Sequence, residues 1–388
     1  MRPHQPIVRR ARCSSLSAIL LVLCSANVVA ASGGYEQTNL VTDDQANLVS
    51  SGYQPAHTVD PNLINPWGIS LGPTTPIWIS NAETGTSTLY DGAGNKIPLT
   101  VTVPGAPTGQ VFGGGNFQLA GQPGPSFFVF ASEDGTISQW NLPITTQAQV
   151  AVDNSAGGSI YKGLAQAQVG NANQLYATDF HNNRIDVFDS HFGTVLNLPG
   201  AFTDPNLPEG YAPFGIQNIG GDLYVTYAKQ DANAKDDLHG IGHGFVDIYQ
   251  TDGTLLSRFA SRGVLNSPWG VALAPATFGE FAGDLLIGNF GDGLINVFDP
   301  NTHTFIDHLI DSDGEALVID GLWGLAFGNG SNGAATNSLY FTAGISDEAH
   351  GLFGVIAPVP LPASLPLLSG AIALLAGIRR RHARLISA

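Results

Sequence analysis

The chain contains Asn65-Pro66-Trp67-Gly68-Ile69 and three segments that closely resemble it: Ala212-Pro213-Phe214-Gly215-Ile216, Ser267-Pro268-Trp269-Gly270-Val271 and Gly321-Leu322-Trp323-Gly324-Leu325. Two weaker copies lie between the first and second of these: Thr108-Gly109-Gln110-Val111 and Lys162-Gly163-Leu164-Ala165. The glycines at positions 68, 109, 163, 215, 270 and 324 are 41, 54, 52, 55 and 54 residues apart. Periods of about 40 to 55 residues that hold several short strands are typical of β-propellers. The repeat predicts an all-β fold, a six-bladed propeller of four-stranded antiparallel blades.

The second and third strands of four blades share one spacing. Strand ends at positions 81, 131, 179 and 289 are followed nine residues later by an aromatic residue. In the fourth blade, 22 residues separate Tyr227 from Tyr249, so this hairpin holds 13 additional residues. The sixth blade offers only three strands between Leu322 and Ile356, and we expect Tyr35 to Thr42 to supply its fourth. This pairing would close the ring without an open strand edge.

The repeated phrase itself has a structural interpretation. Its proline interrupts the loop, its aromatic residue packs, and its glycine allows a crowded inner strand to approach the next blade. We favour this interpretation over a ring of aromatic residues that stack on sugars.

Residues 1–31 have the features of a secretory signal peptide. They include four arginines, an apolar run from Leu16 to Val29, and Ala30-Ala31 before the expected cleavage point. Both cysteines, Cys13 and Cys24, lie in this segment, so the exported protein would have no thiol for a disulfide or a zinc cluster. The exported domain is expected to comprise residues 32–357.

Residues 358–388 are expected to form a membrane and sorting segment. Leu361 to Ile378 is apolar and would reach about 27 Å as a helix, close to a hydrocarbon core of about 30 Å. Arg379-Arg380-Arg381 follow and would stay on the cytoplasmic side. Together with Val359-Pro360-Leu361-Pro362-Ala363, this order resembles the PEP-CTERM sorting tail of Gram-negative bacteria. The resemblance implies an inner-membrane anchor that an exosortase cuts, with release to the cell surface or extracellular matrix; a permanent transmembrane anchor is the alternative.

The body of the chain is strongly acidic. Eight of the 15 basic residues lie in the two end segments, so seven remain in the body against all 31 acidic residues, a net charge near −24. This charge opposes binding to nucleic acid and favours solubility, cations or cationic partners. A solvated acidic surface is the simpler explanation.

Equivalent positions of the aligned hairpins should face one another around the propeller axis. One ring would contain Asn81, Asp179 and Asn289, whose oxygens are of the type that Ca²⁺ takes. A second ring, two residues further on, would contain Glu83, Glu133, His181 and Lys229. We take the first set as a candidate metal site, Glu83 as a candidate binding residue, and His181 and Glu133 as candidate catalytic bases. The alternative is a polar mouth that holds only water.

The inserted hairpin of the fourth blade, residues 228–244, is the second candidate region. A long insertion at one defined place in a repeated fold is more often functional than filler. Its candidate binding residues are Asp231, Asp236, Asp237, His239 and His243. The two histidines could chelate a transition metal with a nearby carboxylate. A solvated glycine-rich loop is the alternative.

Several longer segments carry a family resemblance: Asp60 to Gly68, Phe130 to Ile137, Phe202 to Pro208, Tyr224 to Asp231, Gly288 to Gly293 and Ile319 to Gly324. Together they resemble an uncharacterised bacterial family of exported, NHL-like propellers, many with PEP-CTERM tails. The resemblance implies six blades and brings no known reaction. Similarity to gluconolactonase-type and virginiamycin-lyase-type propellers is architectural only, and a fold does not determine an activity.

Two functions are consistent with these features. The first is a non-enzymatic binding platform at the cell surface or in the matrix, with extracellular polysaccharide or a surface protein as partner. The alternative is a Ca²⁺-assisted lactonase, lyase or hydrolase with its site at the propeller mouth. Ca²⁺ is the cofactor that we name for this alternative, and no other cofactor is predicted. The chain contains no G-x-S-x-G elbow, phosphate-binding loop or H-E-x-x-H motif.

Overall fold

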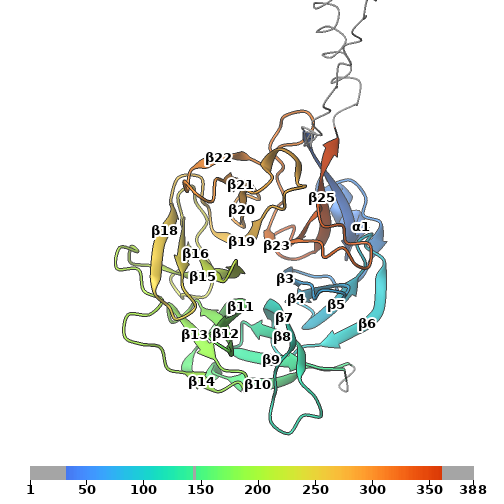
Figure 1. Ribbon diagram of the computed structural model, residues 1–388. Coiled ribbons are helices and arrows are strands. Elements are labelled where there is room, and N and C mark those ends of the chain that lie inside the picture. The colour runs from blue at the N-terminus through green and yellow to red at the C-terminus, as the bar shows by residue number, and fades with distance from the viewer. Residues whose placement is uncertain (1–31, 143–145, 361–388) are drawn as a thin grey trace, which may run out of the picture.

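The computed structural model describes residues 32–142 and 146–360, which form a six-bladed β-propeller (Figure 1). Six twisted sheets surround a central axis, which confirms the predicted fold. The predicted signal peptide, residues 1–31, and most of the predicted tail, residues 361–388, lie outside the described residues. Across the two described ranges, no helix has the length and apolar character needed to cross a membrane.

Five blades contain four antiparallel strands each, numbered from the axis outward. Blade 1 consists of β3 (Pro66–Ser70), β4 (Ile77–Asn81), β5 (Thr86–Tyr90) and β6 (Lys96–Thr102). Blade 2 consists of β7 (Pro107–Phe117), β8 (Ser126–Ser132), β9 (Thr136–Trp140) and β10 (Gln149–Asp153). Blade 3 consists of β11 (Tyr161–Val169), β12 (Ala172–Asp179), β13 (Arg184–Phe188) and β14 (Thr194–Val195).

The remaining blades follow the same order. Blade 4 consists of β15 (Tyr211–Ile219), β16 (Asp222–Lys229), β17 (Gly244–Tyr249) and β18 (Leu255–Ser261). Blade 5 consists of β19 (Pro268–Leu273), β20 (Leu285–Asn289), β21 (Ile295–Phe298) and β22 (Phe305–His308). Blade 6 consists of β23 (Leu322–Phe327), β24 (Leu339–Ala343), β25 (Leu352–Pro360) and β1 (Ser32–Thr42), with β2 (Thr58–Val59) added outside β1. The short helices are α1 (Gln45–Ser50), η1 (Ser155–Gly157) and η2 (Gly279–Phe281).

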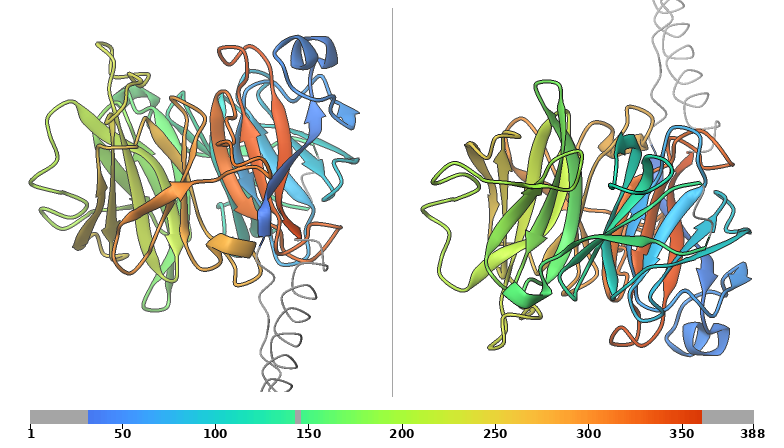
Figure 2. Two further views of the ribbon diagram at one scale, coloured as in Figure 1. Left: turned by 90° about the horizontal axis from the view of Figure 1, so that it is seen from above. Right: turned by 90° about the horizontal axis from the view of Figure 1, so that it is seen from below.

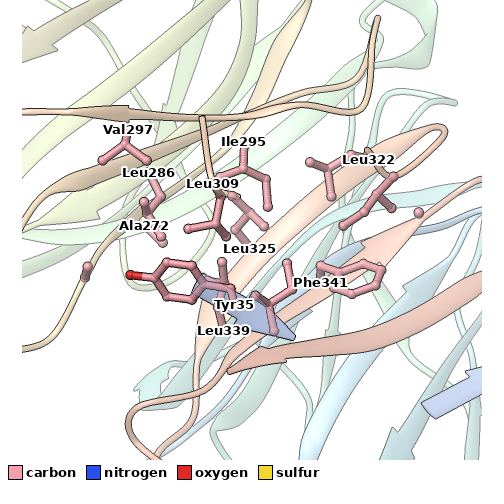
Figure 3. Packing of buried hydrophobic residues seen from close by; sticks show 14 of the residues in the cluster. Tyr35, Ala272, Leu286, Ile295, Val297, Leu309, Leu322, Leu325, Leu339 and Phe341 are labelled. Carbon is pink, nitrogen blue, oxygen red and sulfur yellow. The ribbon is translucent and has the colours of Figure 1, made fainter. Parts of the chain in front are cut away.

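Strand β1 closes the ring, as predicted for the segment from Tyr35 to Thr42. It pairs antiparallel with β25 along its length, for example Thr38 with Val355. The Tyr35 hydroxyl donates a hydrogen bond to the Phe278 carbonyl oxygen at 2.8 Å, and the Tyr35 ring stacks on Phe281. Figure 3 shows Tyr35 inside the hydrophobic cluster between blades 5 and 6. The N-terminal strand is therefore held by side-chain packing as well as by the backbone ladder.

The hydrophobic core is divided among the interfaces between blades. Six clusters of buried side chains each join two neighbouring blades around the whole ring. A seventh cluster lies on the axis. A blade has two apolar faces and can bury both only against its neighbours, which explains why the repeat needs a closed ring.

The six repeated glycines mark the closest contacts between inner strands. A Cβ atom on Gly215 would lie 2.2 Å from the Trp269 carbonyl oxygen, and one on Gly324 would lie 2.7 Å from the Trp67 carbonyl oxygen. The same relation holds for Gly68, Gly109, Gly163 and Gly270, each against the inner strand of the following blade. These contacts confirm that the glycines allow the inner strands to approach closely.

The propeller has two different faces (Figure 2). Inner strands begin, and the turns between second and third strands lie, on one face: Pro66 pairs with Asn81, next to the β4–β5 turn. The inserted loop between β16 and β17 also lies there, and we call this side the insertion face. Strand β25 begins at Leu352 on the insertion face and ends at Pro360 on the other, paired with Ser32. Both ends of the described chain therefore lie on the face opposite the insertion.

Candidate functional site

The aromatic residues of the repeated phrase meet on the axis near the insertion face. The Trp67 and Trp323 rings stack with 3.5 Å between centroids, and Phe290 stacks on the other side of Trp323 at 3.9 Å. Trp269 and Phe214 pack edge-on against Trp67. Trp67, Phe214, Phe290 and Trp323 belong to the buried axial cluster. This confirms that the aromatic residues pack. We call the end of the axis on the insertion face the mouth, and these aromatic rings lie at its base.

Lys162 occupies the same position in blade 3 that these aromatic residues occupy in other blades. Its side chain is only 2% exposed, and its Nζ lies 5.0 Å from the centre of the Trp67 ring. The ammonium group forms ion pairs with the Glu133 carboxylate and, at 3.4 Å, with Asp236. A buried cation needs such partners, because burying an unpaired charge is costly. The Trp67 ring adds a cation–π contact.

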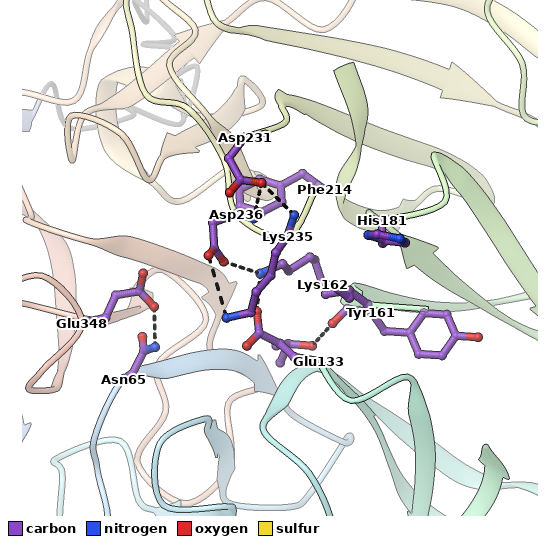
Figure 4. Close-up of polar contacts among 12 residues, drawn as sticks. Asn65, Glu133, Tyr161, Lys162, His181, Phe214, Asp231, Lys235, Asp236 and Glu348 are labelled. Atoms are coloured by element: carbon purple, nitrogen blue, oxygen red, sulfur yellow. Dashed lines mark hydrogen bonds and ion pairs between the residues drawn. The ribbon is translucent and has the colours of Figure 1, made fainter. Parts of the chain in front are cut away.

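Four carboxylates from four blades surround the mouth. They belong to Glu83 in the β4–β5 turn, Glu133 in the β8–β9 turn, Asp236 in the inserted loop and Glu348 in the β24–β25 turn. Their combined charge, with Glu133 contributing most, raises the pKa of Lys235. The Lys235 Nζ lies 3.8 Å from Asp236, and its half-exposed side chain extends from the loop toward Glu133 (Figure 4). The two ammonium groups leave this mouth with an excess of negative charge.

Glu348 is held in place by an unusual backbone turn. Ser346, Asp347 and Glu348 have φ values of 57°, 58° and 63°, the left-handed region that residues with a Cβ rarely occupy. The Asn65 amide donates a hydrogen bond of 2.5 Å to Glu348 and accepts one from the Trp323 indole at 3.1 Å. Strained backbone of this kind occurs most often at functional sites. Burial raises the pKa of Glu348, while the Asn65 hydrogen bond and the Lys162 charge oppose that rise.

Glu348→Gln is expected to stabilise the protein more at pH 8 than at pH 4. Because the pKa of Glu348 is raised above its reference value of 4.5, the folded state holds the proton more tightly than the unfolded state. Ionised Glu348 therefore costs stability, a cost that is absent below the unfolded pKa and grows as pH rises through the folded pKa. A neutral glutamine avoids this cost. Urea midpoints of both proteins at the two pH values measure the difference, and a gap that narrows with pH would contradict it.

The inserted loop lies across the mouth between blades 3 and 5. Asp231 organises it: its Oδ1 accepts hydrogen bonds from the backbone of Asn233 and Lys235, and these backbone bonds, that of Lys235 first, lower the pKa of Asp231. The Ala234 carbonyl oxygen lies 3.3 Å from His181 Nδ1, and Gly240 donates a hydrogen bond to Asn266 at 2.6 Å. The loop is thus fastened to both neighbouring blades.

The other loop candidates have separate positions. His239 stacks on Phe290, and its Nδ1 lies 3.4 Å from Asp237, whose pKa is raised by burial. His243 Nδ1 instead lies 2.9 Å from the Leu238 carbonyl oxygen. Within the described ranges, no hydrogen bond, ion pair or ring contact joins His239 to His243. In residues 32–142 and 146–360, no three His, Cys, Asp or Glu side chains are arranged to hold a metal ion.

The candidate calcium ligands are buried and hydrogen-bonded around their own hairpins. Asn81 donates to Thr86 and Thr88, Asp179 pairs with Asn182 and Arg184, and Asn289 bonds Asn266, Val264 and Asp292. No hydrogen bond or ion pair within the described ranges joins the three to one another. The calcium site stays a prediction. Asn81 Oδ1 accepts no hydrogen bond within the described ranges, whereas a metal at Asp179 or Asn289 would have to displace hydrogen bonds that their side-chain oxygens accept.

Sequence reasoning identified Glu83, Glu133 and Asp236 but missed Lys162, Glu348 and Asn65. Lys162 was recognisable as the only cation at the aromatic position of the repeat. Glu348 lies in a β24–β25 turn that spans Ala343 to Leu352 and is longer than the turns of blades 1, 2, 3 and 5. Glu83 and Glu133 each lie two residues after a predicted strand end, at position 81 or 131. Because the β24–β25 turn is longer, this spacing does not identify Glu348.

A cavity lies at the other end of the axis. It has a volume of about 620 Å³, opens on the face opposite the insertion and is lined by the inner strands of all six blades. A narrow continuation of about 30 Å³ leads from it past Trp269 and the repeated glycines. Sequence reasoning placed binding on the insertion face and did not anticipate this funnel.

Comparison with known proteins gives the family. Uncharacterized protein R648 of Acanthamoeba polyphaga mimivirus is 38% identical over 319 residues, which cover 78% of this chain and 77% of the viral protein. Protein L690 of the same virus, also uncharacterised, is 35% identical over 324 residues, or 79% and 83% of the two chains. The chain belongs to the family of these viral proteins. Membership of this R648 family assigns no reaction, and no model of a known protein family matches the chain.

The R648-family relatives bear on the predicted resemblance to bacterial exported propellers with PEP-CTERM tails. They are viral and uncharacterised, so they do not support the bacterial PEP-CTERM part of that resemblance. Among solved structures, a protein of unknown function from Bacteroides thetaiotaomicron is 11% identical, with 83% of this chain and 76% of that chain covered and a TM-score of 0.51. This likeness shows a shared fold alone. A streptogramin B lyase structure has 13% identity over 84% of this chain and 97% of its own, with a TM-score of 0.48.

Proposed function

We propose that this protein is an exported binding platform, associated with the cell surface or the extracellular matrix, and that the mouth on the insertion face is its ligand site. The ligand is cationic: an ammonium-bearing segment of a surface protein. The single observation that carries this proposal is the meeting of carboxylates from several blades near the ammonium group of Lys235, which lies 3.8 Å from Asp236 with Glu133 and Glu348 close by (Figure 4).

In the proposed site, the Lys235 side chain of the protein itself lies where a ligand cation would bind. Lys235 belongs to a loop that most blades lack, and its side chain is about half exposed. Its position supports the proposed ligand class, because an ammonium group already lies near Glu133, Asp236 and Glu348. A ligand cation that replaced it would meet the same carboxylates, and the strained turn at Glu348 holds one of them ready.

The two faces suit an anchored protein. Strand β25 leads from Leu352 at the mouth to Pro360 on the far face, about 26 Å away at roughly 3.3 Å per residue. The apolar stretch Leu361 to Ile378 follows Pro360 in the sequence. A protein held through this stretch would present the mouth away from the membrane, free to meet a partner.

Lys235→Ala is expected to increase the affinity of the full chain for an oligolysine peptide about three- to fivefold at low ionic strength. Removing an exposed ammonium group frees the carboxylates of an interaction worth up to about 1 kcal/mol. Glu348→Gln should weaken the same binding, and both effects should shrink in high salt. Isothermal titration calorimetry measures the affinities.

Asp313→Asn is the matched control for this experiment. It removes one negative charge, as Glu348→Gln does. Asp313 lies in an exposed turn after blade 5, and the backbone pairing of Asp311 with Tyr35 places this turn on the face opposite the mouth. Oligolysine affinity should be unaffected by it. Equal losses in both variants would show non-specific attraction to an acidic surface, and absence of binding by the wild type and Lys235→Ala would overturn the proposed ligand class.

Two further measurements concern export and the enzymatic alternative. The mass of the protein in membrane and secreted fractions of the producing cells should show whether residues 1–31 and the tail are removed.

Calcium analysis of the purified protein, with unfolding followed in the presence and absence of a chelator, tests the alternative of a Ca²⁺-assisted lactonase, lyase or hydrolase. A metal-free protein that chelator does not affect would contradict that alternative.

A further inference from the structure

The funnel opposite the insertion has the size of a small-molecule site. Its volume of about 620 Å³ lies within the range of about 300 to 1,000 Å³ that is usual for ligand pockets. The narrow continuation of about 30 Å³ has room for about one water molecule. Beyond it, the stacked Trp67 and Trp323 rings fill the axis. The funnel is therefore a dead-ended pocket with one opening.

The funnel differs in charge from the rest of the body. None of the described side chains that line it is acidic or basic, although the chain carries 31 acidic residues. Moving a charged ligand from water into such a lining would be costly, because no opposite charge is available. The lining therefore selects an uncharged ligand.

One side of the funnel is polar and the other is apolar. Blades 3 and 4 contribute Gln166, Gln217 and Asn218, whereas blades 1 and 6 contribute Leu71 and Phe327 across the axis. Two polar side chains also line the apolar side, but both are hydrogen-bonded within the protein: Ser70 to Gln110, and Asn329 to the carbonyl oxygens of Gly72 and Thr75. Leu273 of blade 5 extends the apolar side and is 44% exposed. Leu71 and Phe327 are partly buried against neighbouring hydrophobic clusters, so the apolar side offers a ligand Leu273 and the accessible parts of these two side chains. Apolar walls with a few polar groups are usual in ligand pockets.

Two amide groups on the polar side are available to a ligand. Gln217 is exposed and forms no side-chain hydrogen bond to any residue of the described ranges. Gln166 donates from Nε2 to the Phe112 carbonyl oxygen, which fixes its orientation and leaves its Oε1 as an acceptor. By contrast, Gln110 is buried and its amide bonds Ser70, Ser80 and Ser87. The funnel thus combines a fixed acceptor with one adaptable amide.

We propose that this funnel binds a small, uncharged, amphipathic molecule whose apolar body packs against Leu71, Leu273 and Phe327 and whose polar edge bonds Gln166 and Gln217. This second site is independent of the mouth, because the aromatic plug separates the two. One protein can therefore hold a cationic partner on one face and a neutral ligand on the other.

The test uses the full chain and the uncharged dye Nile red, whose fluorescence increases in an apolar site. Wild type should bind the dye saturably, and Leu273→Arg should weaken binding at least tenfold by placing a charge in the funnel. Leu256→Arg is the matched control: Leu256 is 46% exposed, lies on β18 and does not line the funnel. Its dye affinity should equal that of the wild type.

A second dye tests the polar edge. Diphenylhexatriene is uncharged and has no hydrogen-bonding group, so Gln217→Leu should weaken Nile red about threefold and leave diphenylhexatriene binding unchanged or stronger. Glu348→Gln should alter neither dye, so failure at the mouth and failure at the funnel are distinguishable. Absence of saturable binding by the wild type, or equal losses in Leu273→Arg and Leu256→Arg, would overturn the proposed site.

Discussion

Gly215→Ala is expected to lower the free energy of unfolding by about 3 kcal/mol, at the upper end of the usual cost of overpacking. The new Cβ would lie 2.2 Å from the Trp269 carbonyl oxygen and 2.8 Å from the Thr226 hydroxyl. Neither atom can move freely. Trp269 belongs to the inner strand of blade 5, and Thr226 accepts a 2.8 Å hydrogen bond from the Gly215 amide. The clash must therefore separate two blades or displace the hydroxyl that holds the strand.

Two other glycines test whether close approach is the cause. At Gly163 the corresponding contacts are 3.0 and 3.1 Å, so Gly163→Ala should cost only about 1 kcal/mol. At Gly157 no atom lies within 4 Å, and Gly157→Ala should change stability by less than about 0.5 kcal/mol. Urea unfolding with unchanged slope measures all three. Equal effects at Gly215 and Gly157 would contradict the argument.

The same glycines explain why the fold could be predicted. A propeller repeats one steric requirement at each inner strand, and only glycine meets it, so the spacing of Gly68, Gly215 and Gly270 records the blades directly. The closure by Tyr35 to Thr42 followed from counting strands in the sixth blade. The insertion in blade 4 followed from comparing one hairpin with the others. Each of these conclusions depended only on the spacing of residues along the chain, which can be counted in the sequence.

The candidate site was predicted less completely because it depends on side-chain direction. Asn81 and Asp179 occupy equivalent positions, but their side chains bond groups around their own hairpins. Glu133 was identified as a possible base, whereas the structure pairs it with Lys162, a residue noted only as part of a weak repeat. A repeat alignment shows which residues are equivalent and does not show which of them contact one another.

The funnel was missed for a different reason. Its lining comes from the residues that follow each repeated glycine, such as Leu71, Gln166 and Phe327, and these differ in character from blade to blade. If the same apolar residue type had recurred at these positions in every blade, the repeat would have suggested core packing. Their variety is what gives the funnel a polar and an apolar side, and this contrast becomes visible only when the blades are placed around an axis.

Lys162→Met is expected to lower the free energy of unfolding by about 3 kcal/mol, the low end of the cost of breaking a buried ion pair. The low end applies because Glu133 is 20% exposed, so water screens part of its charge. Methionine retains the unbranched apolar stem as far as Cε and removes the ammonium group that lies over Trp67, so the loss mainly reports the charge. Without the ammonium group, Glu133, Asp236 and Glu348 would repel one another beneath the inserted loop.

The double variant Lys162→Met with Glu133→Gln separates this charge effect from lost packing. Replacing both members of a buried pair by neutral groups is often far less costly than removing one, so the second change should recover about half of the loss. Lys235→Met is the control: Lys235 is half exposed and 3.8 Å from Asp236, and its removal should change stability by less than about 0.5 kcal/mol. Urea midpoints of the wild type, Lys162→Met, Glu133→Gln and the double variant complete the cycle. Losses that simply add would show that Lys162 supports the axis by packing, whereas recovery would show that its charge is what allows carboxylates from several blades to meet at the mouth.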